Sequence, residues 1–174
     1  IVLEGPTATP VCAFAVKHLN TKGAIMFTAS HNPPEYQGLK FIPFYAGPAT
    51  PDITSVIESY IPDAPAKIKA AEEDARTFDP TENYIAHVKS LVQISGNGQV
   101  VVTDTLHGVG GRYLPRILRE CGFEVVSINE ELRPDFAGLS PEPKRETLGN
   151  LASEARKLKT LGLSTDGDAD RFGI

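Results

Sequence analysis

The sequence is poor in cysteine, in basic clusters and in long apolar runs, and each absence excludes a class of protein. Cys12 and Cys121 are its only cysteines, and neither has a partner at metal-ligand spacing, which is typical of a reducing cytoplasm. No apolar run reaches the roughly 18 residues that a transmembrane helix needs. The 17 basic residues are outnumbered by 22 acidic ones and form no long run. We therefore expect a cytoplasmic protein with neither a nucleic-acid nor a membrane partner.

The composition is otherwise that of an ordinary globular protein. Hydrophobic residues make up 41% and charged residues 22% of the 174 positions, which suits one large domain or two small ones. Both ends interrupt apolar runs, residues 1–3 at the start and residues 172–174 at the end. We therefore expect the sequence to be an internal piece of a longer protein.

Helices and strands alternate in the second half of the sequence. Apolar residues recur there at helical spacing in three segments, and a short apolar run follows each one. Such alternation implies right-handed βαβ units and a largely parallel sheet. The expected helices are 84–92, 114–121 and 148–158, and the expected strands are 99–103, 123–128 and 162–165.

The first half carries weaker signals of the same kind. Thr-Pro pairs predict helix starts at Thr9 and Thr50, because a capping hydroxyl precedes a proline at the first helical position. Residues 24–28 are expected to form a buried strand and residues 38–44 the next strand. The predicted fold class is therefore α/β, with mixed, largely parallel sheets flanked by helices, in one partial and one nearly complete domain.

Residues 66–79 form the expected linker between these domains. Pro62 and Pro65 precede this segment, which is acidic and has few large apolar side chains. Residues 66–76 could equally form a short solvated helix. The predicted division is a first domain at 1–65, a linker at 66–79 and a second domain at 80–174.

Ser30 lies in the run TASHNPP (residues 28–34), directly after an expected strand. The prolines block helix formation and restrict Asn32, so the turn is stiff and presents its side chains. Gly38 allows an unusual backbone turn before Lys40, whose ammonium group could fold back over the loop and stabilise phosphate charge or shuttle a proton. His31 could act as a base or orient a phosphate. The loop therefore offers a hydroxyl nucleophile, and the alternative is a capping serine beside a surface histidine.

Asp166, Asp168 and Asp170 alternate with small residues, so that the backbone can wrap and the carboxylates can converge on one cation. Carboxylate-rich oxygen ligation favours Mg²⁺ or Ca²⁺ over zinc. A calcium EF-hand is excluded, because Arg171 stands where that loop needs glycine. A solvated acidic turn is the remaining alternative, although strand-like flanks and small spacers fit it poorly.

Two further segments carry weaker signals. Residues 104–111 (DTLHGVGG) lie between a strand and a helix, where a glycine-rich turn could bind an anion. They lack the Walker lysine and the dinucleotide-binding glycine spacing, so we expect a structural turn and a structural role for His107. Residues 141–143 (PEP) are expected to be a rigid lead-in to the next helix, without chemistry of their own.

The two loops together resemble those of the α-D-phosphohexomutases, the phosphoglucomutase/phosphomannomutase superfamily. Residues 6–16, 104–111 and 141–143 also resemble landmarks of that family, whereas Gln37 departs from the asparagine of many members. Family members have four domains around a central cleft. The chain resembles the back half of the first domain and nearly all of the second, and the remaining domains of the parent chain would be its partners.

The resemblance implies an intramolecular phosphotransferase that interconverts 1- and 6-phosphates of glucose or mannose. Ser30 resembles the residue that carries the phosphate and completes the metal shell, and Arg171 resembles the cation that steadies this phosphate. His31 and Lys40 resemble proton-transfer and phosphate contacts. A hexose 1,6-bisphosphate would serve as intermediate and activator. The residues that resemble Mg²⁺ ligands are Asp166, Asp168 and Asp170.

Two other functions fit the same loops. A phosphoglucosamine mutase uses both of them, although Glu35 and Tyr36 lean toward the glucose and mannose group. A metal- and anion-binding α/β module without catalysis is the alternative outside enzymes. We expect the fragment to be inactive alone as a mutase, because the groups that grip the sugar from the far side of the cleft would be missing.

Overall fold

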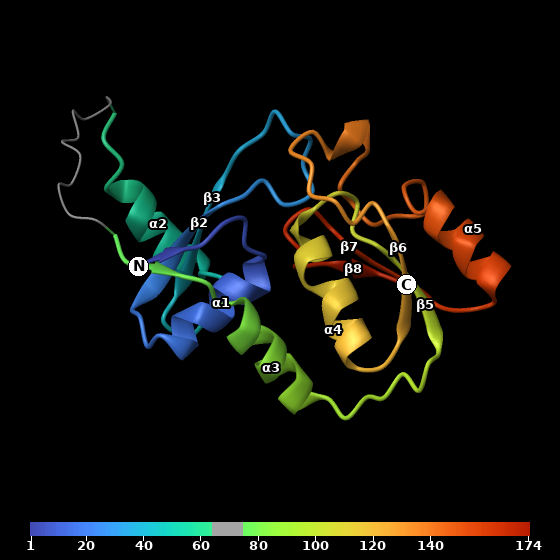
Figure 1. Cartoon of the computed structure of the whole chain (residues 1–174). Coiled ribbons are helices and arrows are strands. Elements are labelled where there is room, and N and C mark those ends of the chain that lie inside the picture. The colour runs from blue at the N-terminus through green and yellow to red at the C-terminus, as the bar shows by residue number, and fades with distance from the viewer. Residues whose placement is uncertain (64–74) are drawn as a thin grey trace.

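The elements of the chain form two units that lie side by side (Figure 1), and the computed structural model describes residues 1–63 and 75–174. The first unit contains β1 (Val2–Leu3), α1 (Thr9–His18), β2 (Gly23–Phe27), β3 (Leu39–Pro43), α2 (Pro51–Ser59) and β4 (Thr77–Phe78). The second contains α3 (Thr81–Leu91), β5 (Val100–Asp104), η1 (Val109–Arg112), α4 (Leu114–Glu120), β6 (Glu124–Ile128), η2 (Phe136–Gly138), α5 (Gly149–Leu158), β7 (Gly162–Thr165) and β8 (Phe172–Gly173).

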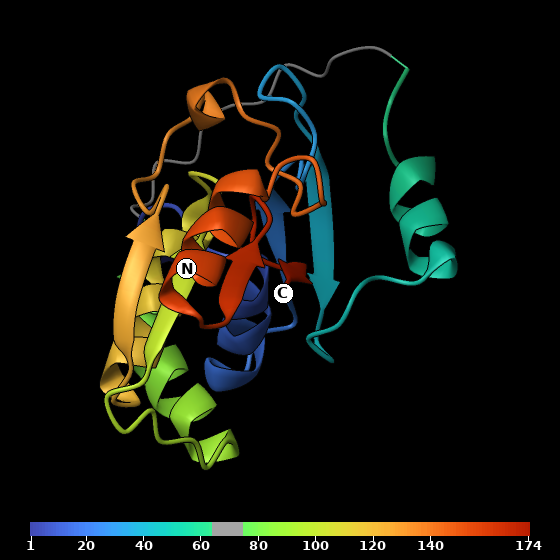
Figure 2. The ribbon, with the colours of Figure 1, turned by 90° about the vertical axis from the view of Figure 1, so that its right-hand side faces the viewer.

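A four-stranded sheet in the order β6-β5-β7-β8 organises the second unit. β5 pairs in parallel with β6 and with β7, and β8 returns antiparallel to β7. Because the chain crosses from β5 to β6 and then back past β5 to β7, right-handed connections put α4 and α5 on opposite faces (Figure 2). Four of the five residues of β5 are buried, as expected for a central parallel strand. The predicted α/β class with mixed, largely parallel sheets is confirmed.

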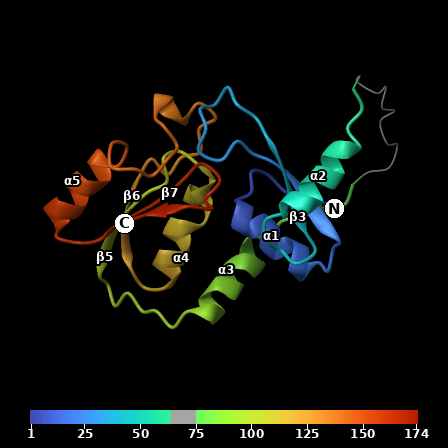
Figure 3. The same ribbon diagram turned by 180° about the vertical axis from the view of Figure 1, so that it is seen from behind.

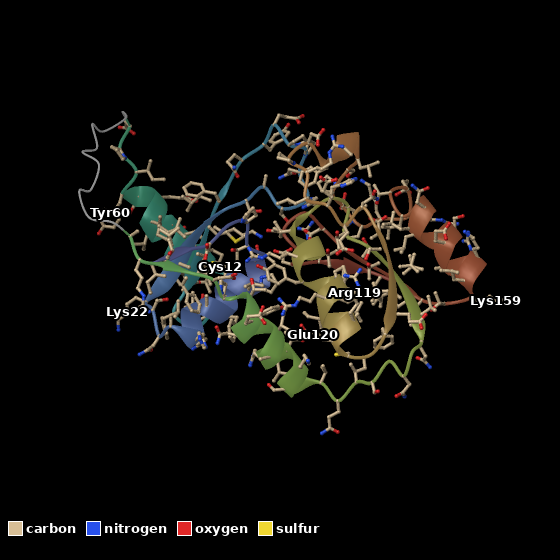
Figure 4. All side chains as sticks on the ribbon, in the orientation of Figure 1. Cys12, Lys22, Tyr60, Arg119, Glu120 and Lys159 are labelled. Carbon is tan, nitrogen blue, oxygen red and sulfur yellow. The ribbon has the colours of Figure 1, made fainter. Side chains whose placement is uncertain are left out.

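The first unit is built on the antiparallel pair β2–β3, with α1 on its inner face. Cys12 and Val16 of α1 pack there against Ile42, and Figure 4 shows Cys12 in the interior of this unit. The outer face of the pair is apolar but open, since Ile25 and Phe27 are 64% and 72% exposed. The strand predicted at 24–28 therefore exists, but the expectation that it is buried is wrong for this face.

Helix α2 begins at Pro51, as the Thr-Pro pair predicts, but it packs differently from α1. None of its residues is buried, and it stands apart from the other elements (Figure 2). Tyr60, directly after the helix, is 83% exposed and lies at the outer side of the first unit (Figure 4). The apolar side chains of this helix, among them Val56 at 58% exposed, therefore meet no core in the described part of the chain.

Part of the expected linker is a strand of the first unit. Thr77 and Phe78 form β4, which pairs in parallel with β1 through the registers Val2–Thr77 and Leu3–Phe78. Residues 66–74, and with them most of the alternative helix at 66–76, lie outside the described residues.

The two units are joined by a shared hydrophobic core and by hydrogen bonds from one arginine. Ala8 and Val11 of the first unit pack against Tyr113 of the second, and α1 lies beside α3 when the molecule is seen from behind (Figure 3). Arg112 donates to the Asp79 carboxylate at 2.9 Å and to the carbonyl of Glu4 at 3.2 Å. The packing and these hydrogen bonds fix the two units against each other.

Candidate active site

The loop between β2 and β3 meets the loop after β7 where the two units touch (Figure 1). Ser30 Oγ donates to Asp166 Oδ2 at 3.1 Å. The backbones approach equally closely, because a Cβ atom on Gly167 would lie 2.5 Å from the carbonyl oxygen of Ser30. The small spacer at position 167 is therefore required by contact with the serine loop, in addition to the wrapping of its own loop.

Ser30 adopts a left-handed backbone conformation, with φ of 56°, which non-glycine residues seldom occupy. Its amide donates to Thr28 Oγ1 at 2.9 Å, which holds this turn. Gly38 lies across the loop, where a Cβ atom would come within 2.8 Å of the Thr28 carbonyl oxygen. The glycine is therefore needed for close approach, and the expectation of an unusual backbone turn at Gly38 is wrong, because its φ is not in the left-handed region.

The three aspartates gather at the carboxyl end of β7, where open α/β sheets place their ligands. One carboxylate oxygen from each lies within 4.8 Å of the others. Asp166 and Asp168 are 0% and 3% exposed, whereas Asp170 is exposed. Burial raises the pKa of Asp166 to about 6, and the charges of Asp168 and Asp170 add to that rise. Three carboxylates therefore lie close together, and two of them are buried.

Among the described residues, the Asp168 carboxylate accepts hydrogen bonds through one oxygen only. Its Oδ2 accepts hydrogen bonds from Lys40 Nζ at 2.8 Å, Thr9 Oγ1 at 2.8 Å and Thr28 Oγ1 at 3.0 Å. Its Oδ1 is buried and has no hydrogen-bond partner among the described residues. Burial acts to raise the pKa of Asp168, but the bonds from Lys40 and Thr9 outweigh it and the pKa is lowered. A charged carboxylate with one open, buried oxygen is suited to binding a cation.

Lys40 reaches from β3 into the same cluster. Its ammonium group forms ion pairs with Asp168 and with Asp170, both at 2.8 Å. Burial acts to lower the pKa of Lys40, but its bonds to Asp168 and Asp170 outweigh burial and raise it. Lys40 is therefore a fixed positive charge held by the aspartate loop.

His31 and Arg171, which sequence reasoning placed in separate loops, are in contact through His31 Nδ1 and Arg171 Nη1. Because a guanidinium group only donates, Nδ1 accepts and the proton of a neutral ring lies on Nε2. The Arg171 amide donates to Asp166 Oδ1 at 3.0 Å. The structure thus brings together every residue that the sequence analysis named for the site: Ser30, His31, Lys40, Asp166, Asp168, Asp170 and Arg171.

Three residues of this neighbourhood were missed. Thr9 and Thr28 bind Asp168, although Thr9 was interpreted as a helix cap; the helix start is correct, but no side chain caps it. The third residue is Glu142. Its hydrogen bond from Lys144 lowers its pKa most, and the charges of His31 and Arg171 lower it further, so Glu142 lies within the electrostatic reach of that pair. The hydroxyls at the start of α1 and in the serine loop were the available signal for the two threonines, but their partner, 140 or more positions away, was not visible locally.

The glycine-rich turn after β5 supports the aspartate loop from behind. A Cβ atom on Gly108 would lie 2.7 Å from the carbonyl oxygen of Gly167, and the Val109 amide donates to that oxygen at 3.0 Å. His107 contacts the carbonyl of Glu131 at 2.8 Å through Nδ1. Both observations fit the structural role predicted for this turn.

Comparison with known families assigns both units. Residues 1–67 match the model of phosphoglucomutase/phosphomannomutase alpha/beta/alpha domain I, and residues 82–174 match that of domain II. The structure is similar to that of a putative phosphomannomutase from Thermus thermophilus, with a TM-score of 0.87 and 37% identity over 98% of this chain and 40% of that one.

Individual relatives carry two kinds of name. A probable phosphoglucosamine mutase from Thermococcus gammatolerans is 34% identical over 98% of this chain and 38% of its own length. A phosphoglucomutase/phosphomannomutase from Thermococcus kodakarensis is 35% identical over 98% of this chain and 39% of its own length. The chain therefore spans about two fifths of the length of the relatives that it matches. By its fold and both of its domain matches, the chain belongs to the phosphoglucomutase/phosphomannomutase family.

Proposed function

We propose that this chain carries the phosphoserine and the metal site of a phosphohexomutase, with Ser30 as the residue that receives and returns the phosphoryl group. The observation that supports this most is the hydrogen bond from Ser30 Oγ to Asp166 Oδ2, since it joins a hydroxyl of one domain to an acidic cluster of the other. The domain division at 1–65, 66–79 and 80–174 is part of the same proposal. Acceptance by Ser30 would form a bond from Oγ to phosphorus as the bond from phosphorus to a sugar oxygen breaks, and the serine proton, which points at Asp166, would end on the released sugar oxygen.

Asp166, Asp168 and Asp170 are proposed to hold Mg²⁺. Their oxygen-only donor set suits a hard cation, and the buried Asp168 Oδ1 lacks a partner in the described residues. When bound, the cation supplies neutralisation of charge on the phosphoryl group that is transferred. Ser30 lies close enough to Asp166 for its oxygen to belong to the same site.

The cationic residues are proposed to bind phosphate. Lys40 keeps its proton, because its pKa is raised, so it donates hydrogen bonds rather than accepting a proton. His31 presents Nε2–H when Arg171 occupies Nδ1, which suits the orientation of a phosphate oxygen. Arg171, always charged, steadies the same group.

The substrate is proposed to be a hexose phosphate, with interconversion of glucose or mannose 1- and 6-phosphates through a bisphosphorylated sugar. The bond from phosphorus to Ser30 Oγ would break as the bond to a sugar hydroxyl forms, and the other phosphate would later return to the serine. Relatives named as phosphoglucosamine mutases support the amino sugar as the second candidate. The remaining domains, which the relatives contain, would select among these sugars.

Phosphorylation of the chain tests the proposal directly. We would incubate it with glucose 1,6-bisphosphate and Mg²⁺ and measure intact mass, expecting one added phosphoryl group that maps to Ser30. Ser30→Ala should accept none, whereas the exposed Ser95→Ala should behave like the unaltered chain. No added phosphate on the unaltered chain would favour the metal- and anion-binding module instead.

A further inference from the structure

Two threonines and one lysine meet at a single oxygen of Asp168, and neither threonine has a role in the function proposed so far. Thr9 comes from the first turn of α1 and Thr28 from the end of β2. With Lys40 they place three donors on Asp168 Oδ2. Oδ1, the other oxygen of this carboxylate, is buried with no donor from the described residues. The donors therefore fix which oxygen stays open.

Thr28 has a second bond that reaches the nucleophile. Its Oγ1 accepts the Ser30 amide at 2.9 Å while donating its own proton to Asp168. A hydroxyl has one proton and two lone pairs, so it can serve both partners at once. Since Ser30 is in the left-handed region, this bond contributes to holding a conformation that costs free energy. One side chain thus connects the Ser30 backbone to Asp168.

Thr9 holds Asp168 from the other domain in two ways. Its hydroxyl donates to Oδ2 at 2.8 Å and its amide donates to the Asp168 carbonyl oxygen at 2.9 Å. Both the side chain and the backbone of the aspartate are therefore fixed to the first turn of α1. The hydrogen bond from the Thr9 amide remains in any variant that keeps the start of the helix, so the contribution of the Thr9 hydroxyl can be tested separately.

We propose that Thr28 and Thr9 are positioning residues that keep Asp168 Oδ1 open for the cation, and that Thr28 also couples this ligand to the conformation of Ser30. The inference rests on the proposed function. Hydrogen-bond partners behind a metal ligand orient it, and their loss typically weakens metal binding about 10- to 100-fold. Without Thr28, Asp168 Oδ2 would keep only its bonds from Thr9 and Lys40 and would be held less firmly, and the Ser30 amide would lose its acceptor.

Magnesium titration calorimetry on the unphosphorylated 174-residue chain provides a readout besides activity. Thr28→Val removes the hydroxyl with little change of shape and should weaken Mg²⁺ binding about 10- to 100-fold, whereas Thr28→Ser should restore it. Thr9→Val should weaken Mg²⁺ binding as well, with Thr9→Ser as its rescue. Thr54→Val is the matched control, because among the described residues the Thr54 hydroxyl bonds to the carbonyl of Pro51 within helix α2.

The coupling to Ser30 is tested by the rate of phosphorylation at saturating Mg²⁺. At saturating Mg²⁺, Thr28→Val should still be phosphorylated slowly, because the turn at Ser30 is altered. Thr9→Val should then be phosphorylated at the rate of the unaltered chain. Thermal melting reports whether each variant folds, and the two serine variants carry the test if a valine variant does not. Unchanged affinity in both valine variants, beside normal binding by the unaltered chain, overturns this inference alone. No Mg²⁺ binding by the unaltered chain overturns it together with the proposed function.

Discussion

Ser30 and Asp166 lie 136 positions apart in the sequence, and the serine hydroxyl donates to the aspartate carboxylate at 3.1 Å. The two residues belong to different domains of the family. Their distance is set by the docking of the two units, through the core of Ala8, Val11 and Tyr113. Substitutions that loosen this core should therefore alter the geometry of the site, although the substituted residues do not contact it.

Asp168→Asn should weaken Mg²⁺ binding and slow phosphorylation of Ser30 together. The substitution removes a charge and replaces one oxygen by an amide nitrogen, which cannot accept the bonds that Asp168 Oδ2 now accepts from Thr9, Thr28 and Lys40. Calorimetry and intact-mass kinetics measure the two effects, with Asp52→Asn on the exposed start of α2 as the control. Unchanged Mg²⁺ affinity in Asp168→Asn would contradict the proposed metal site.

Gly167→Ala should separate the two loops. The added Cβ atom would lie 2.5 Å from the carbonyl oxygen of Ser30, and overpacking of this kind costs about 1–3 kcal/mol. We expect slower Ser30 phosphorylation and a lower free energy of unfolding, measured by urea denaturation. Gly149→Ala is the matched control, because a Cβ atom there meets nothing within 4 Å and alanine favours a helix. Equal phosphorylation rates in the two variants would speak against the close approach.

The two faces of the β2–β3 pair should differ in their contribution to stability. Ile42 is 4% exposed against α1, whereas Leu39 on the same strand is 57% exposed. Ile42→Ala should lower the free energy of unfolding by about 2–5 kcal/mol, and Leu39→Ala by less than about 1 kcal/mol. Chemical denaturation of both variants measures this. Similar losses would mean that the outer face is covered in solution.

The ion pair of Asp79 with Arg112 should make the stability of the chain depend on pH in the acid range. Bonds from the Thr81 hydroxyl and amide, together with the Arg112 charge, lower the pKa of Asp79 below its ordinary value of 3.8. A carboxyl group with a lowered pKa in the folded state stabilises the fold fully at pH values above its ordinary pKa. This contribution is lost as the pH falls through the lowered pKa. Asp79→Asn should therefore be less stable than the unaltered chain near neutral pH.

The stability difference between these two proteins should shrink below about pH 4, where the unaltered chain loses the same charge. Denaturant midpoints measured from about pH 7 down to about pH 3 provide the comparison. A difference that stays constant over this range would show that the carboxylate charge of Asp79 is not responsible.

The chain alone should convert glucose 1-phosphate to glucose 6-phosphate at no more than a small fraction of the rate of a complete mutase. It spans about two fifths of its relatives, and the proposed reaction would need the sugar positioned by groups beyond those of this chain. A coupled assay with a bisphosphate primer measures this. Turnover comparable to that of a complete enzyme would contradict the domain interpretation.

Local sequence patterns predicted the features that depend on neighbouring residues alone. Apolar spacing predicted helices α3, α4 and α5 and the parallel strands β5, β6 and β7 but not the short strand β8, and the carboxylates at positions 166, 168 and 170 predicted a cluster after a strand. Periodicity could not tell that Ile25 and Phe27 face outward, because a run of apolar residues reads the same whether one face of the strand is covered or both. For Thr9 the local signal was misleading, since a hydroxyl before proline fits a helix cap as well as a distant carboxylate.

The sequence by itself determined the chemistry that is available: one hydroxyl in a stiff loop, three carboxylates with small spacers, and the cations Lys40 and Arg171. Only the tertiary structure decided how these groups meet. Lys40, Thr9 and Thr28 share a single oxygen of Asp168, and Gly167 is needed because Ser30 passes over it. These contacts join residues more than 120 positions apart, and they exist because the two units dock through a common core. No local pattern encodes that docking.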